Sequence, residues 1–164
     1  MKSIGIIREF RKDEKRTPLI PKQIKQLKNK FPYVKFIVQP SRNRCFSDSD
    51  YQKNGAEIQE DLSIADIILG VKEVDTSNLI KNKIYIFFSH TTKIQKDGSA
   101  AAQGTPGMDK KKLLIDILKK NITLIDYENI RDLNSKRYLG FGRFAGIVGC
   151  YNTLNLLLKI SNND

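Results

Sequence analysis

The stretch "IADIILGVKEV", residues 64–74, decides the fold class that we assign to this chain. It is an apolar run rich in Ile that ends in two ionisable residues, Lys72 and Glu73. Such a run, bounded by polar residues, is typical of a strand that is buried on both faces. A second run, "KIYIFFSHTTK" at residues 83–93, ends at His90, the only histidine of the chain. Ligands of open α/β sheets bind outside the carboxyl ends of such strands, so both strand ends indicate a site.

Strand-like and helix-like patterns alternate along the chain on both sides of this stretch. Besides the two runs quoted above, we expect strands at residues 3–7, 34–39 and 122–128, and helices at residues 21–31, 48–53, 77–81, 109–120 and 143–160. Apolar strands that alternate with helices form a parallel sheet with helices on both faces. We therefore predict an α/β fold, a Rossmann-like open parallel sheet in a three-layer α/β/α arrangement.

Right-handed crossovers bring the carboxyl ends of all strands in a parallel sheet to one edge. The ionisable residues that follow the expected strands, and would share this edge, are Arg8, Glu9, Lys72, Glu73, His90 and Glu128. Charged residues also end strands simply because the chain must leave the sheet. The convergence of a lysine, a histidine and carboxylates favours a functional site over that simpler explanation.

The composition is that of one globular domain, with 164 residues of which 40% are hydrophobic and 29% charged. No apolar run approaches the length of a membrane span, and the N-terminus is too short and too charged for a signal peptide. The two cysteines, Cys45 and Cys150, are far apart and show no metal or redox spacing. We therefore expect a cytoplasmic protein with reduced thiols, no membrane contact and no bound metal.

The formal charge of +11 is concentrated in residues 1–45, which hold 13 Lys or Arg and 3 Asp or Glu. A basic segment of this kind can attract nucleic acid or anionic small molecules. Its lysines, however, interleave with apolar residues at helical spacing, as on a solvated helix face. No nucleic-acid-binding motif accompanies them, so we expect no nucleic-acid partner.

Two glycine-containing segments stand apart from the alternating pattern. The first, "DGSAAAQGTPGMD" at residues 97–109, has no periodicity and predicts a flexible loop. Its composition resembles an insertion left by cloning, in which case the native coding sequence should lack it. The second, "GFGRFA" at residues 140–145, matches the dinucleotide pattern G-x-G-x-x-A but has no buried strand before it. We expect these glycines to serve a loop and close helix packing, not a cofactor.

Several segments of this chain, in order, resemble the N-terminal domain of the alanine dehydrogenase/pyridine nucleotide transhydrogenase superfamily. They are "DEKRTPLIPKQI", the run from "VQPSRN" to "GVKEV", "YIFFSHTTKIQ", "LIDYE" and "FGRFAGIVG". Within that superfamily the chain resembles lysine–2-oxoglutarate reductase and lysine-forming saccharopine dehydrogenase. The resemblance implies the substrate-binding half of an oxidoreductase of lysine metabolism, with saccharopine, lysine and 2-oxoglutarate as substrates.

The resemblance also implies roles for individual residues. Lys72 in "GVKEV" and His90 in "FSHTTK" match the lysine and the histidine that act as acid–base groups in the family. Arg16 in "EKRTPLIP" matches an arginine that binds a substrate carboxylate. The further candidates for substrate binding are Glu73, Glu128 and Arg143. Imine formation and hydrolysis need proton transfers near neutral pH, which a histidine performs as it stands and a lysine performs in a suitable environment.

Family enzymes carry a separate dinucleotide-binding domain after this one, and the chain lacks it. We therefore expect residues 1–142 to be the substrate-binding domain and residues 143–164 to be a helix that leads toward the absent domain. NAD or NADP would bind in the full-length enzyme, and no cofactor would bind this chain alone. By itself the chain should not catalyse hydride transfer.

A different class of function stays open on the sequence alone. The chain could be a stand-alone, non-catalytic module that binds an amino acid or a partner protein and regulates. A natural stop after Asp164 would support the module, whereas a reading frame that continues into a glycine-rich βαβ unit would support the enzyme. Without a neighbouring domain, the apolar helix at residues 143–160 would favour self-association, for instance as a homodimer.

Overall fold

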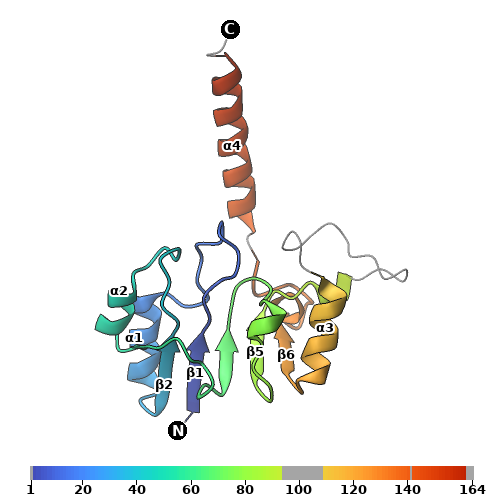
Figure 1. Ribbon diagram of the computed structural model, residues 1–164. Helices are drawn as coiled ribbons and strands as arrows, with labels where there is room; N and C mark the ends of the chain where they lie inside the picture. The colour runs from blue at the N-terminus through green and yellow to red at the C-terminus, as the bar shows by residue number, and fades with distance from the viewer. Residues whose placement is uncertain (1, 94–108, 141, 162–164) are drawn as a thin grey trace. The chain divides into compact units, whose positions relative to one another are not determined.

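The computed structural model describes residues 2–93, 109–140 and 142–161 and contains a six-stranded sheet (Figure 1). Its strands are β1 (Lys2–Ile6), β2 (Val34–Val38), β3 (Glu57–Ile58), β4 (Ile67–Leu69), β5 (Ile84–Phe87) and β6 (Thr123–Asp126). They lie in the order β3-β2-β1-β4-β5-β6, and every neighbouring pair is parallel. The predicted α/β fold with an open parallel sheet is confirmed.

The direction of the chain across the sheet reverses between β1 and β4. From β1 the strands are added toward β3, and from β4 they are added in the opposite direction toward β6. Ligands of open α/β sheets bind at such a topological switch point, in the crevice beyond the carboxyl ends of the strands. The fold therefore places the expected site next to the ends of β1 and β4.

Three α-helices connect the strands of the first part of the chain: α1 (Pro21–Lys30), α2 (Asp48–Lys53) and α3 (Lys110–Lys119). Pro21 stands in the first turn of α1, where its missing N–H leaves no hydrogen bond unmade. Ser47 caps α2, and Asp109 caps α3 by accepting a hydrogen bond from the N–H of Lys112 at 3.0 Å. Short 3₁₀ turns complete the connections: η1 (Thr76–Asn78), η2 (Thr91–Lys93) and η3 (Tyr127–Asn129).

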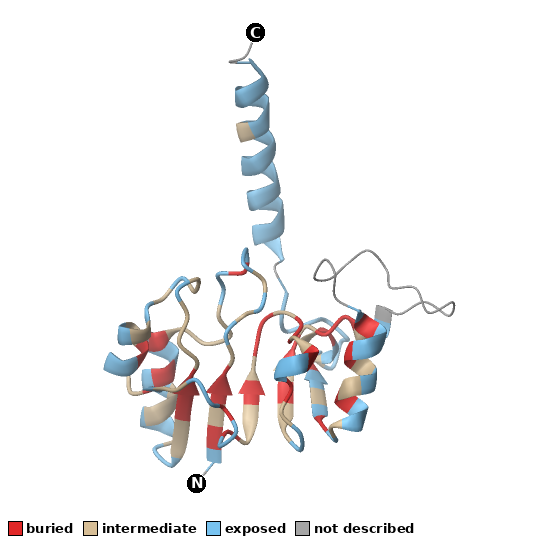
Figure 2. Cartoon of the chain, in the orientation of Figure 1, coloured by how far each residue is buried: buried red, intermediate tan, exposed pale blue. Residues whose placement is uncertain are grey.

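Helices cover both faces of the sheet because the side chains of each strand alternate between two apolar cores. On one face, Phe36 and Val38 of β2 pack with Ile24 of α1 and Tyr51 of α2. On the other face, Ile37 of the same strand joins the core that includes residues of α3. The prediction of helices on both faces is confirmed, and Figure 2 shows that buried residues occur both in the strands and in these helices.

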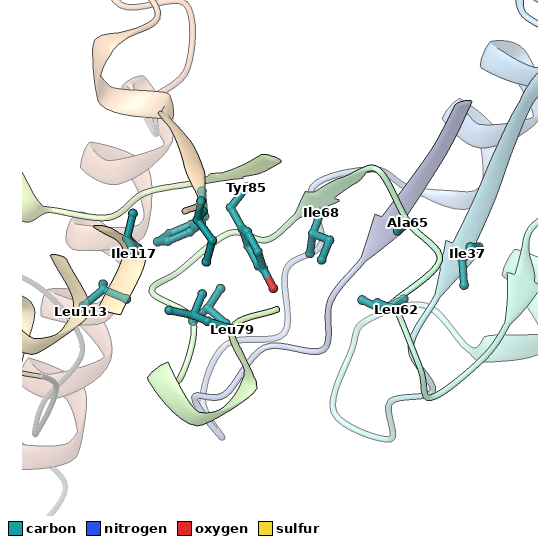
Figure 3. Close-up of a cluster of buried hydrophobic side chains, with 11 residues drawn as sticks. Ile37, Leu62, Ala65, Ile68, Leu79, Tyr85, Leu113 and Ile117 are labelled. Carbon is teal, nitrogen blue, oxygen red and sulfur yellow. The ribbon is translucent and has the colours of Figure 1, made fainter. Parts of the chain in front are cut away.

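The larger core extends along one face of the sheet, from Leu113 and Ile117 of α3 at one end to Leu62 and Ile37 at the other (Figure 3). Tyr85 of β5 is fully buried there, and Leu113 and Ile117 of α3 belong to the same cluster. The hydroxyl group of Tyr85 accepts a hydrogen bond from the N–H of Ile80 at 2.9 Å. The buried ring therefore fixes the segment between η1 and β5 while its polar atom stays satisfied.

The predicted burial of both faces is wrong for β6. Thr123 is exposed, and Ile125 keeps 39% of its surface exposed. On the neighbouring strand β5, Ile84 and Ile86 of the same face are only half-buried. Within the first 129 residues, the helices of this face are α1 and α2, which pack beside β1, β2 and β3 and do not extend over β5 and β6.

The chain divides into two compact units, residues 1–129 and residues 130–164. The second unit contains α4 (Arg143–Ser161), which confirms the long helix predicted at residues 143–160. Its side chains are almost all exposed (Figure 2), and its large exposed apolar residues are Phe144, Ile147, Val148, Tyr151, Leu154, Leu156, Leu157, Leu158 and Ile160. They occur on all sides of the helix, a pattern typical of helices that are buried in a larger assembly. None of the described helices is long and apolar enough to cross a membrane.

Candidate active site

A buried pair between His90 and Glu73 forms the centre of the candidate site. Glu73 follows β4 and is 1% exposed, whereas His90 follows the neighbouring strand β5 and is 8% exposed. The Nδ1 atom of His90 lies 2.6 Å from Oε1 of Glu73. When Glu73 is ionised it only accepts hydrogen bonds, so in that state this pairing puts the ring proton on Nδ1 and leaves Nε2 for proton exchange. The prediction that both residues share the carboxyl edge of the sheet is confirmed.

The backbone of His90 is left-handed, with a φ of +53°. Residues other than glycine seldom adopt this conformation and keep it only where the surroundings fix it. The neighbouring side chains do so here: the hydroxyl of Ser89 lies 2.9 Å from that of Thr91 and accepts a hydrogen bond from the Thr91 N–H at 3.2 Å. The predicted strand that ends at His90 in fact ends at Phe87, and the histidine stands in the short connection between β5 and η2.

Glu128 lies near the other nitrogen of the His90 ring. It belongs to η3, which directly follows β6, and it is 6% exposed. Its Oε1 atom is 4.0 Å from Nε2 of His90, too far for a hydrogen bond but close enough for a substantial electrostatic interaction. The ring therefore has a carboxyl group beside each nitrogen. Such carboxylates stabilise the positive charge that an imidazole gains when it accepts a proton from a substrate.

Lys72 is held at the switch point by Glu9, the predicted edge residue that follows β1. Oε1 of Glu9 accepts a hydrogen bond from the N–H of Val71 at 2.7 Å, and Oε2 accepts one from the N–H of Lys72 at 2.9 Å. Burial raises the pKa of Glu9 to about 7, although these two hydrogen bonds act in the opposite direction. A carboxyl group that titrates near neutral pH thus fixes the backbone of the candidate catalytic lysine.

A cavity of about 460 Å³ opens at the same switch point. Glu9, Lys72 and Glu73 contribute to its wall, and its volume is within the range of small-molecule sites. His90 and Glu128 do not line this cavity. Glu73 does line it and also contacts His90, so a ligand in the cavity would lie one side chain away from the imidazole.

The candidate carboxylate-binding residue Arg16 is paired with Glu14. Its Nε and Nη2 atoms donate to the two carboxylate oxygens of Glu14 at 2.8 and 2.6 Å. Burial disfavours the ionised form of Glu14, but the hydrogen bonds from Arg16 outweigh it and lower the pKa of that carboxyl group. Since 48% of the Arg16 side chain is exposed, a substrate carboxylate could still reach the oriented guanidinium group.

Arg8 shares the predicted edge but belongs to a different contact. Its guanidinium group donates to Oε1 of Glu60 at 2.6 Å and to the carbonyl oxygen of Pro40 at 2.9 Å. Both partners follow the other half of the sheet, β2 and β3. The structure therefore brings Glu9, Lys72, Glu73, His90 and Glu128 into one site, and Arg8, paired with Glu60, also lines the cavity of that site.

Two acidic residues of the site were missed by the sequence analysis. Glu14 orients Arg16, and Asp126 accepts hydrogen bonds from the N–H of Ser89 at 3.2 Å and from the N–H of Glu128 at 2.8 Å. Asp126 stands inside the predicted strand at residues 122–128, where it resembles any polar residue at a strand end. Its position two residues before the candidate Glu128 could have drawn attention to it, but the sequence does not show the direction of its side chain.

Arg143 lies in the second unit, and the predicted insertion lies almost entirely outside the described residues. Arg143 is the first residue of α4 in the second unit, where its guanidinium carbon lies 5.3 Å from the ring centre of Phe144. Its role in substrate binding stays a prediction. Of the stretch at residues 97–109, only Asp109 lies within the described residues, and it begins α3 as a cap.

The fold and its site define a class of protein, and solved structures share that fold. An L-alanine dehydrogenase matches 82% of this chain and 34% of its own chain with a TM-score of 0.63 at 20% sequence identity. A transhydrogenase from Sinorhizobium meliloti matches 80% and 36% with a TM-score of 0.60 at 16% identity. This chain is therefore a Rossmann-like α/β domain with ionisable residues at its switch point.

The sequence comparisons identify the family. A family model, "Alanine dehydrogenase/PNT, N-terminal domain", matches residues 5–148, and the chain belongs to this family. It is 42% identical over 142 residues to the mitochondrial alpha-aminoadipic semialdehyde synthase of Bos taurus and 37% identical over 157 residues to the alpha-aminoadipic semialdehyde synthase of Arabidopsis thaliana. These matches cover 87% and 93% of this chain but only 14% of each relative. The resemblance stated from the sequence is confirmed.

Proposed function

We propose that this chain is the substrate-binding half of a saccharopine dehydrogenase-type oxidoreductase, which interconverts saccharopine with lysine and 2-oxoglutarate. The observation that carries the proposal is the buried Glu73–His90 pair beside Lys72 at the switch point. The relatives named alpha-aminoadipic semialdehyde synthase support it. An aminoadipic semialdehyde has the carbon skeleton of lysine with an aldehyde at the ε carbon, so these relatives are named for a derivative of lysine.

The proposed reaction needs proton transfers at nitrogen and at a carbinol oxygen, because an imine forms or is hydrolysed. His90 is suited to one of these transfers, since Glu73 occupies its Nδ1 atom and Nε2 is left for exchange. Lys72 is the candidate for the second transfer, and Glu9 holds its backbone. Glu128, beside Nε2 of His90, would stabilise the charge that the ring gains.

Carboxylate recognition is assigned to arginine side chains. Saccharopine and 2-oxoglutarate both carry carboxylates, which a guanidinium group binds through two parallel hydrogen bonds. Arg16 is already oriented by Glu14 at the edge of the site. Arg143, which begins α4, is the second candidate.

The described residues do not fit a nicotinamide cofactor. A dinucleotide site needs a glycine-rich turn that directly follows a buried strand and opens a helix. The connection from β1 to α1, residues 7–20, contains no glycine. The segment before Gly140 and Gly142 contains only an isolated bridge between Arg131 and Arg137. We therefore propose that NAD or NADP binds a separate domain and that this chain alone is inactive in hydride transfer.

The proposal also includes the cellular location and the oligomeric state of the protein. A cytoplasmic location is proposed, whereas the relatives from rat, cattle and mouse are mitochondrial proteins by name. A homodimer is proposed on the basis of the exposed apolar side chains of α4.

Calorimetric titration of the chain with saccharopine, lysine and 2-oxoglutarate tests the proposed function. We expect saccharopine to bind, Arg16→Ala to weaken the binding by about tenfold or more, and His90→Ala to have a smaller effect on affinity. Arg42→Ala is the matched control, because Arg42 is an exposed arginine outside the site. Its affinity should equal that of the unmodified chain.

Two results would count against this function. Equal weakening by Arg16→Ala and Arg42→Ala would show a general charge effect instead of a carboxylate site. The absence of binding to all three compounds by a folded chain would favour the non-catalytic module.

A further inference from the structure

Asp126 joins the connection that carries His90, between β5 and η2, to η3, which carries Glu128. It is the last residue of β6 and is 6% exposed. Its Oδ2 atom accepts hydrogen bonds from both the N–H group, at 3.2 Å, and the hydroxyl group of Ser89. Its Oδ1 atom accepts a hydrogen bond from the N–H of Glu128 at 2.8 Å. One buried carboxylate therefore binds both Ser89, the residue before His90, and Glu128, the carboxyl residue beside the His90 ring.

These bonds act on the backbone conformation that presents the histidine. Ser89 is fully buried, and its hydroxyl group also accepts a hydrogen bond from the N–H of Thr91, so His90 is fixed on both sides. His90 keeps a left-handed backbone that the sequence alone would not favour. Among the described residues, the hydrogen bonds to the Asp126 carboxylate are the ones that hold Ser89 against the end of β6.

We propose that Asp126 is a positioning residue that holds the imidazole of His90 between Glu73 and Glu128. The proposal rests on the proposed function, because it assigns Asp126 a part in the acid–base site. It acts through His90 and through the turn of Glu128, and it touches neither the cavity nor a substrate. The same two contacts set the 4.0 Å separation between Nε2 of His90 and Oε1 of Glu128.

A purely structural role would be to hold β5 and β6 together, and backbone pairing already does this. Phe87 pairs with Asp126 in the regular parallel register, as do the three residue pairs before them. A comparable bond also exists far from the site. Asp66 accepts hydrogen bonds from the N–H and the hydroxyl group of Ser3 at 2.8 and 3.0 Å, at the amino edge of the sheet. Asp66 therefore provides a matched control.

The test uses the ring proton of the only histidine, so its nuclear magnetic resonance signal needs no assignment against other histidines. In the unmodified chain the Nδ1 proton is buried against Glu73 and should exchange slowly with water. Asp126→Asn keeps the shape of the side chain but replaces one acceptor oxygen by an NH₂ group. Either Ser89 or Glu128 then faces a donor, and the turn should open more often.

We expect Asp126→Asn to speed the exchange of the His90 Nδ1 proton by on the order of tenfold, and Asp66→Asn to leave it within about twofold. Ser89→Ala, which removes one of the two bonds to Oδ2, should give an intermediate rate and serves if Asp126→Asn does not fold. A folded Asp126→Asn protein with an unchanged exchange rate would overturn the proposal. So would unfolding of both site variants while Asp66→Asn remains folded, because the role would then be structural.

The measurement is made without a ligand, so it separates this proposal from the proposed function. Faster ring-proton exchange in Asp126→Asn supports the positioning role, whatever the titration with saccharopine gives. A chain that binds no saccharopine would contradict the proposed function and leave the observed control of the histidine by Asp126 in place.

Discussion

The carboxyl groups of the site differ in their pKa values, although they lie close together at one edge of the sheet. Burial raises the pKa of Glu9 to about 7, whereas Arg16 lowers the pKa of Glu14 against the effect of burial. Groups whose environments separate their pKa values in this way can hold and release protons at the same pH. The ionisation of Glu9 and Glu14 therefore differs at neutral pH, and each can be tested by its own substitution.

Glu9 should make the stability of the chain depend on pH. Its folded-state pKa lies above the ordinary value of 4.5, so folding favours the neutral form. This contribution is present below about pH 4.5 and is lost as the pH rises through about 7, by at most about 3 kcal/mol. We expect the free energy of unfolding, measured with urea, to fall between about pH 5 and pH 8 and to fall less in Glu9→Gln.

Glu60→Gln is the control for this pH dependence. Glu60 is exposed, and its hydrogen bond with Arg8 lowers the pKa of its carboxyl group, so it does not titrate in that window. Its variant should show the same fall as the unmodified chain. Parallel pH profiles for Glu9→Gln and the unmodified chain would show that Glu9 is not the titrating group.

Glu73→Ala should destabilise the first unit by about 1–3 kcal/mol, because the buried Nδ1–H of His90 would lose its acceptor. Glu57→Ala is the control: Glu57 pairs with Lys35 on the surface and should change stability by less than about 0.5 kcal/mol. Urea denaturation of both variants measures the difference. Equal effects would mean that the buried pair contributes no more than a surface ion pair.

Among the elements, the turns beyond the strands carry the site, and this limits what the sequence could predict. The edge shared by Lys72, Glu73 and His90 was predictable, because apolar runs indicate parallel strands and parallel strands end together. The run at residues 64–74, however, yields only the three residues of β4, and its polar end lies in the connection after that strand. The left-handed backbone of His90 could not be predicted, since the residue before it, Ser89, is held by Asp126, which is 37 residues away in the sequence.

Gly55, which follows α2, illustrates an element boundary that depends on one residue. Its φ of +91° is strained for any residue with a Cβ atom, so Gly55→Ala should destabilise the first unit by about 1–2 kcal/mol. Gln52→Ala, at an exposed position within α2, should be nearly neutral. The denaturation midpoints of the two variants measure the difference in stability. A Gly55→Ala protein as stable as the unmodified chain would mean that the backbone relaxes to another conformation.

For the whole molecule, the exposed apolar surface of α4 predicts self-association. Leu154 and Leu157 expose 55% and 57% of their surface, and replacing both with Lys should reduce association measured by sedimentation at increasing concentration. Leu133→Lys is the control, because Leu133 is fully exposed outside α4. A chain that stays monomeric at all concentrations, or one whose association survives both substitutions, would refute the proposed homodimer.

The reversal of strand order between β1 and β4 has a consequence for the folding pathway. The β1-α1-β2 unit forms from neighbours in sequence, whereas the contact between Glu9 and Lys72 closes a segment of 63 residues. Such long-range pairings form slowly, since the entropy of loop closure must be overcome first. Binding competence should therefore appear only in the slowest refolding phase, and an incomplete nascent chain would bind no substrate during synthesis.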